Sequence, residues 1–326
     1  VSVGISKAGF DLDVIGMVPI PVANFTTWKA SSESNSYIAG VYITASHNPA
    51  EYNGIRFRHS DGTGYTEGNL EIKRIFFEDE LKVSDKVGKI TIQSTDEILD
   101  TYVDFVSEKV GSLDGMKVAL DPGNGVGCVI IDRLFQKMGA ETFSINNEPD
   151  GRFPNRPSEP APKNLGDLIS IMETGDYDMG IAFDGDADRC VFIDNKAKAV
   201  SAEKIGIITS RGLIKPGANK VLAGVPCSMI LEDEIPKIGG ELIWIRVGDV
   251  FVCENKFCVE PNPTQFGDGY DWTEQIEVSK ALKSMAQEYE TPVFSPYQTD
   301  ASGEARFAKG ILDLSLIHIS EPTRPY

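Results

Sequence analysis

Residues 179–189 of this chain read Met179-Gly-Ile-Ala-Phe-Asp-Gly-Asp-Ala-Asp-Arg189. The first five residues form a short apolar run, as in a β-strand buried on both faces, and charged residues dominate the six that follow. A buried strand that ends in a polar loop is the recurring element of α/β folds, which bind ligands at the carboxyl ends of their strands. This stretch therefore predicts an α/β fold with a site at the end of a strand.

The same pattern recurs along the chain, where short apolar runs alternate with segments of helical periodicity. The runs predict strands at 40–44, 117–120, 179–183, 220–223 and 241–245, and the periodic segments predict helices at about 96–110, 203–213 and 273–290. We therefore expect three consecutive, similar α/β domains with mixed, mostly parallel sheets and an active site in the inter-domain cleft.

Two breaks in the pattern predict the domain boundaries. Gly111-Ser-Leu-Asp-Gly115 separates a helix from a fresh strand, and Ile214-Lys-Pro-Gly-Ala-Asn219 does the same further on. The predicted domains are 1–111, 112–214 and 215–295, followed by an irregular tail, 296–326, whose last dozen residues look non-native. The chain starts at Val1 in sequence typical of a domain interior, so we expect its true start to lie further upstream.

Composition excludes several classes of function. With 49 acidic and 31 basic residues the net charge is −18, which argues against a nucleic-acid partner. No apolar run reaches the roughly 18 residues of a membrane span, and no signal peptide is visible, so a cytoplasmic protein is expected. The five cysteines form no CxxC pair, which favours reduced thiols over disulfides or zinc.

Three aspartates follow the strand at 179–183 at alternate positions: Asp184, Asp186 and Asp188. In an extended segment their carboxylates point the same way and can converge on one hard cation, Mg²⁺, Mn²⁺ or Ca²⁺. An EF-hand is excluded, because the required glycine and glutamate positions hold Arg189 and Asn195. A phosphatase of the haloacid-dehalogenase type, with an aspartate nucleophile, and a plain acidic turn remain alternatives.

A serine follows the strand at 40–44, within Thr44-Ala-Ser-His-Asn-Pro49. The Asn48-Pro49 turn would hold Ser46 out into a cleft, and a phosphorylated serine there needs only positioning and charge neutralisation to act as a phosphoryl donor. The alternative is a turn that caps the next helix.

Both loops resemble those of one enzyme family. Thr44-Ala-Ser-His-Asn-Pro-Ala-Glu-Tyr-Asn-Gly54 resembles the phosphoserine loop of the α-D-phosphohexomutases (phosphoglucomutase, phosphomannomutase and phosphoglucosamine mutase), and 180–189 resembles their metal loop. The resemblance implies that Ser46 carries the phosphate and that one phosphate oxygen joins the three aspartates around Mg²⁺. Arg189 would hold phosphate or carboxylate beside them.

The resemblance also implies a reaction, the interconversion of hexose 1-phosphate and hexose 6-phosphate through a 1,6-bisphosphate. Mannose or glucose phosphate is our first choice of substrate, and glucosamine phosphate is the alternative. The expected partners are hexose phosphate and hexose 1,6-bisphosphate, without nucleic acid, membrane or an obligate protein partner.

The chain departs from the family pattern at several positions. Many members have a lysine for acid–base work ten residues after the serine, where this chain has Arg56, which stays protonated and can only stabilise charge. Proton transfer then falls to His47 or to the phosphate itself. Gly248 and Asp249 match the substrate loop of the third domain, and only Glu260 matches the sugar-reading loop.

Two further loops resemble family loops that are expected to be structural: the glycine-rich turn 121–127, which lacks the GxGxxG spacing of a dinucleotide site, and 153–160. No Arg-x-Ser-Gly-Thr phosphate loop, the signature of the family's fourth domain, is found. A further alternative is therefore a fragment that binds Mg²⁺ with little or no turnover.

Overall fold

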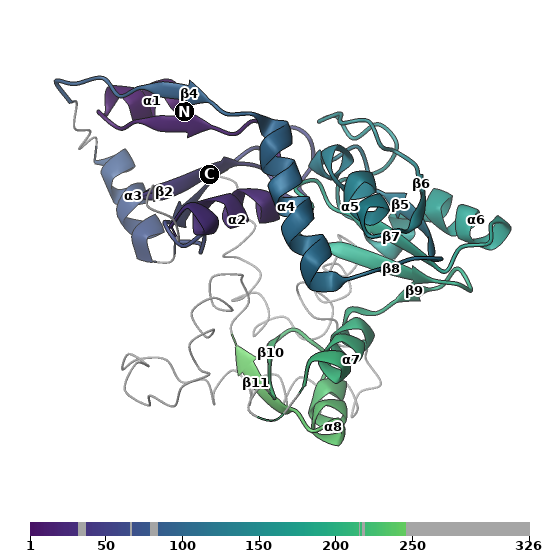
Figure 1. The fold of residues 1–326 in the computed structure, drawn as a ribbon. Helices are drawn as coiled ribbons and strands as arrows, with labels where there is room; N and C mark the ends of the chain where they lie inside the picture. The colour runs from purple at the N-terminus through teal and green to yellow at the C-terminus, as the bar shows by residue number, and fades with distance from the viewer. Residues whose placement is uncertain (32–36, 66, 79–83, 215, 217–218, 246–326) are drawn as a thin grey trace, which may run out of the picture. The chain divides into compact units, whose positions relative to one another are not determined.

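The computed structural model describes residues 1–245 apart from 32–36, 66, 79–83, 215 and 217–218 (Figure 1). The chain divides into two compact units, residues 1–201 and 202–326. The boundaries expected near residues 111 and 214 remain predictions, and the helix predicted at 273–290 lies outside the described residues.

The helices and strands of the first unit follow in chain order. They are α1 (Ser2–Lys7), β1 (Leu12–Val14), α2 (Ile20–Ser31), β2 (Ala39–Ile43), β3 (Ile55–His59), α3 (Glu67–Phe77), β4 (Ile90–Ile92), α4 (Thr95–Val110), β5 (Lys117–Asp121), the 3₁₀ turn η1 (Val126–Val129), α5 (Ile131–Lys137), β6 (Glu141–Ser144), η2 (Pro162–Asn164), α6 (Gly166–Thr174), β7 (Met179–Phe183), β8 (Cys190–Asp194) and β9 (Ala199–Val200).

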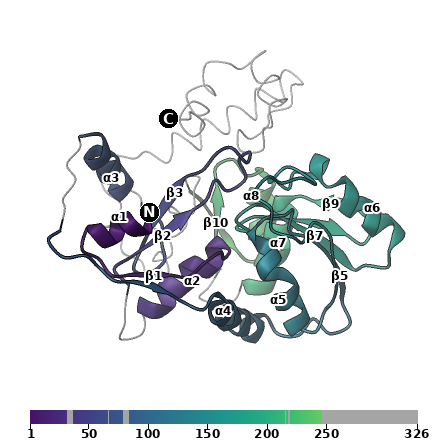
Figure 2. The same ribbon diagram turned by 90° about the horizontal axis from the view of Figure 1, so that it is seen from above.

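The sheet with the most strands in this unit is five-stranded and has the order β6-β5-β7-β8-β9. Strands β6, β5 and β7 are parallel, and β8 and β9 return antiparallel, so the sheet is mixed, as expected. Because successive strand residues point to opposite faces, Val118 and Leu120 join the core with α5, whereas Ala119 joins the core with α6. Figure 2 shows these two helices on either side of the sheet.

Two smaller sheets complete the first unit: the parallel pair β1–β4 and the antiparallel pair β2–β3. Helix α4 packs against α2 and against α5, and so joins the small sheets to the large one (Figure 1). Its amphipathic sequence buries Leu99 and Val103, the Ser94 side chain caps its start, and it ends at Gly111, whose φ of 90° suits a glycine.

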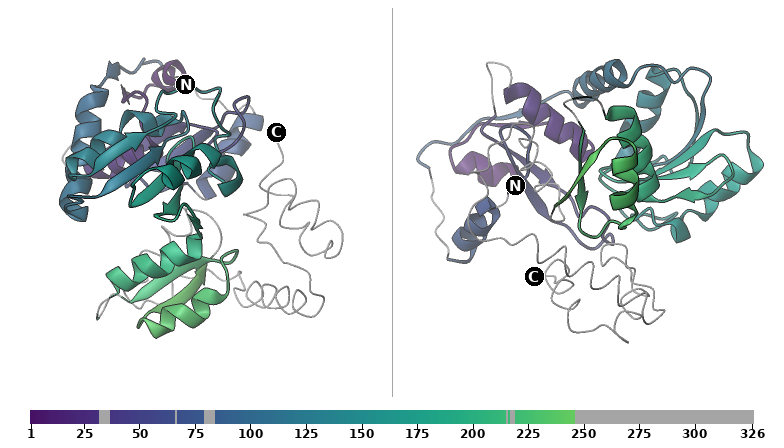
Figure 3. Two further views of the ribbon diagram at one scale, coloured as in Figure 1. Left: turned by 90° about the vertical axis from the view of Figure 1, so that its right-hand side faces the viewer. Right: turned by 90° about the horizontal axis from the view of Figure 1, so that it is seen from below.

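The second unit is described over residues 202–245 with the gaps given above. It contains α7 (Ala202–Leu213), β10 (Lys220–Gly224), α8 (Ile230–Lys237) and β11 (Glu241–Ile245), with β10 and β11 paired in parallel. Both helices lie beside this strand pair in Figure 3, and Ile207, Ala223, Leu231 and Ile235 form the core between them.

The five predicted strands and the first two predicted helices are confirmed, each to within about one residue at either end. Among the helices that the structure describes, none combines the length and the apolar character that crossing a membrane requires.

Candidate active site

The serine loop connects β2 to the antiparallel strand β3, and the Thr44 amide donates to the Gly54 carbonyl across its base (3.0 Å). Within the loop Ser46 has φ of 54°, a left-handed conformation that costs a non-glycine residue roughly 1–2 kcal/mol. The Ser46 amide donates to the Thr44 hydroxyl at 2.8 Å, and the residue is only 8% exposed. The sequence thus places the serine on a tight, strained turn at the end of a strand.

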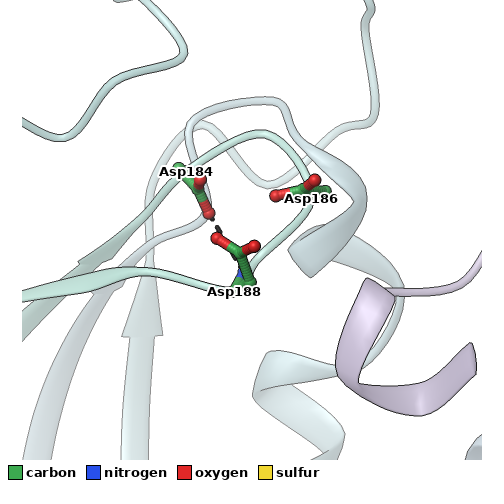
Figure 4. A group of neighbouring side chains, drawn as sticks. All are labelled: Asp184, Asp186 and Asp188. Atoms are coloured by element: carbon green, nitrogen blue, oxygen red, sulfur yellow. Dashed lines mark hydrogen bonds between the residues drawn. The ribbon is translucent and has the colours of Figure 1, made fainter. Parts of the chain in front are cut away.

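The acidic loop connects β7 to the antiparallel strand β8 through a tight turn (Figure 4). The Asp184 Oδ1 atom accepts hydrogen bonds from the Asp188 and Arg189 amides, each at 3.1 Å, and Ala187 is left-handed with φ of 56°. Each of the three aspartates offers an oxygen within 4.8 Å of the others. The carboxylates therefore converge because the loop curls around Asp184. The extended segment that the alternating pattern predicted is not formed.

Burial makes this cluster electrostatically costly. Asp184 is fully buried and Asp186 is 2% exposed. The pKa of Asp184 is raised by burial and then by the charges of Asp188 and Asp186, and the pKa of Asp186 is raised by burial and then by Asp188. The buried Oδ1 of Asp186 has no hydrogen-bond partner among the described residues. A set of hard oxygen donors with one buried oxygen unpaired fits a divalent cation such as Mg²⁺.

The serine loop and the acidic loop lie against each other. The Ser46 hydroxyl is 3.5 Å from Asp184 Oδ2, and the Thr44 hydroxyl donates to Asp186 Oδ2 at 2.9 Å. Thr44 therefore binds the Ser46 amide and an aspartate of the cluster at the same time, and this places the serine at the edge of the carboxylates.

A guanidinium and an imidazole lie beside the serine, and a second guanidinium lies beside the carboxylates. Arg189 donates through Nη2 to the Ser46 hydroxyl (3.0 Å) and through Nε to Asp184 Oδ2 (3.1 Å), and it also contacts Nδ1 of His47. Burial, and then the positive charge of Arg189, lower the pKa of His47 and so favour the uncharged ring. Arg56, on β3, lies 3.7 Å from Asp188 Oδ2.

The structure thus brings seven of the predicted site residues together: Ser46, His47, Arg56, Asp184, Asp186, Asp188 and Arg189. The other three, Gly248, Asp249 and Glu260, lie outside the described residues.

A third loop, residues 153–160, also reaches the site, although its sequence predicted a structural role. The Ser158 hydroxyl donates to the backbone carbonyl of Ser46 at 3.0 Å. The sequence signals were the resemblance of 153–160 to a family loop and the spacing of Pro154, Pro157 and Pro160, and neither indicates what the loop contacts.

The glycine-rich turn supports the acidic loop from the other side, since the Val126 amide donates to the Gly185 carbonyl at 2.9 Å. A Cβ atom on Gly125 would lie 2.8 Å from that carbonyl oxygen and 2.9 Å from the Gly185 Cα. Here glycine is required by the close approach of two backbones.

Gly125→Ala is therefore expected to push the acidic loop out of place and to weaken Mg²⁺ binding roughly tenfold or more. Calorimetric titration of the purified chain with Mg²⁺ measures this. Gly151→Ala is the matched control, because a Cβ there meets nothing within 4 Å. Equal Mg²⁺ affinity for both variants would contradict the expectation.

Comparison with known proteins agrees with this arrangement. Residues 1–82 match the family model of phosphoglucomutase/phosphomannomutase α/β/α domain I, and residues 100–198 match that of domain II. The chain belongs to the α-D-phosphohexomutase family. Each family domain contributes one side of the site, with the serine loop in domain I and the acidic loop in domain II.

Curated relatives in this family include a probable phosphoglucosamine mutase of Methanopyrus kandleri, 36% identical over 80% of this chain, and the phosphoglucosamine mutase of Methanococcus maripaludis, 31% identical over 78%. The aligned region spans 58% and 57% of these relatives, so the chain spans less than two thirds of their length.

Solved structures show the same fold. A phosphoglucomutase/phosphomannomutase family protein from Burkholderia thailandensis superposes with a TM-score of 0.69 at 24% identity, over 78% of this chain and 56% of that one. A phosphoglucomutase from Paramecium, in an open form, superposes with a TM-score of 0.59 at 18% identity, over 74% and 52%.

Proposed function

We propose that this chain carries the phosphoserine and metal sites of a phosphoglucosamine mutase, which exchanges phosphate between C1 and C6 of glucosamine phosphate. The observation that carries the proposal is the Ser46 hydroxyl, held 3.0 Å from Arg189 Nη2 and 3.5 Å from Asp184 in a cluster of three carboxylates. The names of the curated relatives favour glucosamine phosphate over mannose or glucose phosphate, our first choice from the sequence.

In the proposed reaction, phosphate on Ser46 Oγ passes to a free hydroxyl of the hexose phosphate. The bond between phosphorus and Ser46 Oγ breaks as a bond to the sugar oxygen forms, and a hexose 1,6-bisphosphate results. The other phosphate of the bisphosphate then returns to Ser46 Oγ, so the enzyme regains its phosphate and the sugar has exchanged the position of its own.

The residues around Ser46 have the chemistry that each half-reaction needs. Arg189 donates to the serine oxygen and can hold the phosphate as charge builds up on it. His47, with Nδ1 3.4 Å from Ser46 Oγ, is the group that we propose to accept the proton of the attacking hydroxyl and to return it to the leaving serine. The Arg56 guanidinium lies 3.7 Å from Asp188 and balances the negative charge of the carboxylates from that side.

Asp184, Asp186 and Asp188 would hold Mg²⁺, and a phosphate oxygen on Ser46 would complete its set of ligands. When bound, the ion supplies positive charge beside the transferring phosphoryl group. Gly248, Asp249 and Glu260 are proposed to contact the sugar. A cytoplasmic location and the lack of an obligate protein partner stay predictions.

The purified chain is expected to take up one phosphate on Ser46 when it is incubated with Mg²⁺ and glucosamine 1,6-bisphosphate, as measured by intact mass and peptide mapping. Glucose and mannose 1,6-bisphosphates are expected to label it more slowly, by roughly tenfold or more, since a site that hydrogen-bonds one substituent rejects analogues that lack it.

Equal labelling by the three sugars would overturn the choice of substrate and leave the phosphoserine chemistry intact. Labelling of Asp184 in place of Ser46 would instead favour a phosphatase with an aspartate nucleophile. A chain that binds Mg²⁺ but takes no phosphate from any of the three would be the metal-binding fragment without turnover, and would overturn the proposed function.

A further inference from the structure

We propose that Ser158 is a positioning residue, which holds the Ser46 backbone in the conformation that directs its hydroxyl at Asp184 and Arg189. The inference rests on the proposed function, because it assigns a task in phosphate exchange to a residue outside both signature loops. Ser158 lies 112 positions from Ser46 and is 4% exposed.

Hydroxyl groups hold both peptide groups of Ser46. The Thr44 hydroxyl accepts from the Ser46 amide at 2.8 Å, and the Ser158 hydroxyl donates to the Ser46 carbonyl at 3.0 Å. A left-handed serine persists only where its surroundings impose that conformation. Thr44 belongs to the serine loop itself, so Ser158 is the restraint that comes from the other family domain.

Ser158 is in turn fixed by its neighbour Arg156. This buried guanidinium donates to Asp121 Oδ2 and to the Phe183 carbonyl, each at 2.7 Å, and also to the Pro157 carbonyl at 2.9 Å. Phe183 directly precedes Asp184. One side chain therefore anchors both the loop that carries Ser158 and the strand end that leads into the acidic loop.

The loop that carries Ser158, the serine loop and the acidic loop are tightly packed around Gly185. A Cβ atom on Gly185 would lie 2.6 Å from the Ser158 hydroxyl and 2.7 Å from the Ser46 carbonyl oxygen. Ser158 thus sits in van der Waals contact with the acidic loop while it is hydrogen-bonded to the serine loop. This position allows it to set the distance between the Ser46 hydroxyl and the carboxylates.

The test compares Ser158→Ala with Ser6→Ala, a matched control in the same unit. Ser6 is also buried and also donates to a backbone carbonyl, that of Gly88, at 2.6 Å. The maximal rate of Ser46 phosphorylation by glucosamine 1,6-bisphosphate is expected to fall roughly 10- to 100-fold in Ser158→Ala. The bisphosphate concentration that gives half the maximal rate and the Mg²⁺ affinity are expected to stay unchanged. Ser6→Ala is expected to behave like the unsubstituted chain.

A second variant and a second measurement separate positioning from packing. Ser158→Cys fills nearly the same volume with only a weak donor, so it is expected to show most of the same loss of rate. Without any substrate, amide hydrogen exchange in the peptide spanning residues 44–48 is expected to become roughly tenfold faster in both Ser158 variants. The reason is that the loss of one hydrogen bond makes local opening of the serine loop easier by about that factor.

The possible outcomes test the positioning role of Ser158 separately from the proposed function. Phosphorylation of both Ser158 variants at the rate of the unsubstituted chain, with unchanged exchange at 44–48, would overturn the positioning role and leave the proposed function intact. An unsubstituted chain that takes up no phosphate would overturn the proposed function and this inference together.

Discussion

Ser46→Ala is expected to take up no phosphate from a hexose 1,6-bisphosphate, and mutase turnover is expected to fall by on the order of 10⁴ to 10⁶. The physical reason is that the phosphate is bonded to Ser46 Oγ in the proposed mechanism, and alanine has no atom to replace it. Arg189 and Asp184 would then lie around an empty position. Intact mass after incubation with the bisphosphate measures the first effect, and a coupled assay measures the second.

Two controls separate loss of the nucleophile from loss of the fold. Ser6→Ala removes a buried hydroxyl elsewhere in the unit and is expected to keep full labelling. Ser46→Gly also lacks the hydroxyl, but glycine adopts φ of 54° without strain, so this variant is expected to be more stable than Ser46→Ala by about 1 kcal/mol. Phosphate on the Thr44 hydroxyl of the alanine variant would contradict the assignment, and peptide mapping would detect it.

The positions of the main strands and both signature loops were predictable from the sequence. Runs such as Met179-Gly-Ile-Ala-Phe183 are apolar over the length of a strand and end at a polar loop, so local pattern is sufficient to place them. Which strands pair with each other, and in which direction, was harder to predict. Strands β3 and β8 return antiparallel after the serine and acidic loops, and this depends on turns with left-handed residues such as Ser46 and Ala187.

A left-handed serine or alanine carries no sequence signal, since glycine and asparagine are the residues that usually mark such positions. The acidic loop shows the consequence. Three aspartates at alternate positions suggested an extended segment, whereas the hydrogen bonds to Asp184 Oδ1 curl the segment into a turn. The carboxylates still converge as predicted, because the turn keeps all three on its inner side (Figure 4).

The contact between Ser158 and Ser46 could not be predicted from the sequence, for a different reason. The contact joins residues 112 positions apart through a backbone carbonyl. Because every residue has such a carbonyl, the residue types do not indicate which two residues pair. The choice of sugar was also not decided by the sequence, which led us to favour mannose or glucose phosphate, whereas the curated relatives are named phosphoglucosamine mutases.

Asp186→Asn is expected to abolish most of the stabilisation that Mg²⁺ gives the chain. For a ligand that binds only the folded state, a concentration of 100 times Kd raises the free energy of unfolding by about 2.7 kcal/mol. Asparagine keeps the size of the side chain and can still accept from the Thr44 hydroxyl, but it removes one negative charge from the cluster. Thermal unfolding of the two proteins, with and without Mg²⁺, measures the difference.

Without Mg²⁺, Asp186→Asn is not expected to be the less stable of the two proteins. Burial and the charge of Asp188 raise the pKa of Asp186, which means that the folded state disfavours its ionised form. A neutral side chain avoids that cost, so without Mg²⁺ the Asp186→Asn variant is expected to be at least as stable as the unsubstituted chain. Simple damage to the fold would lower stability under both conditions, and the two causes are therefore distinguishable.

Asp176→Asn is the matched control for this experiment. Asp176 is fully exposed, lies outside the carboxylate cluster and forms a surface ion pair with Lys117. Its removal is expected to leave the Mg²⁺ effect unchanged, because exposed pairs contribute little and the ion is held elsewhere. If Asp186→Asn gained as much stability from Mg²⁺ as Asp176→Asn does, the cation would be bound at some other place, and the buried oxygen of Asp186 would need another explanation.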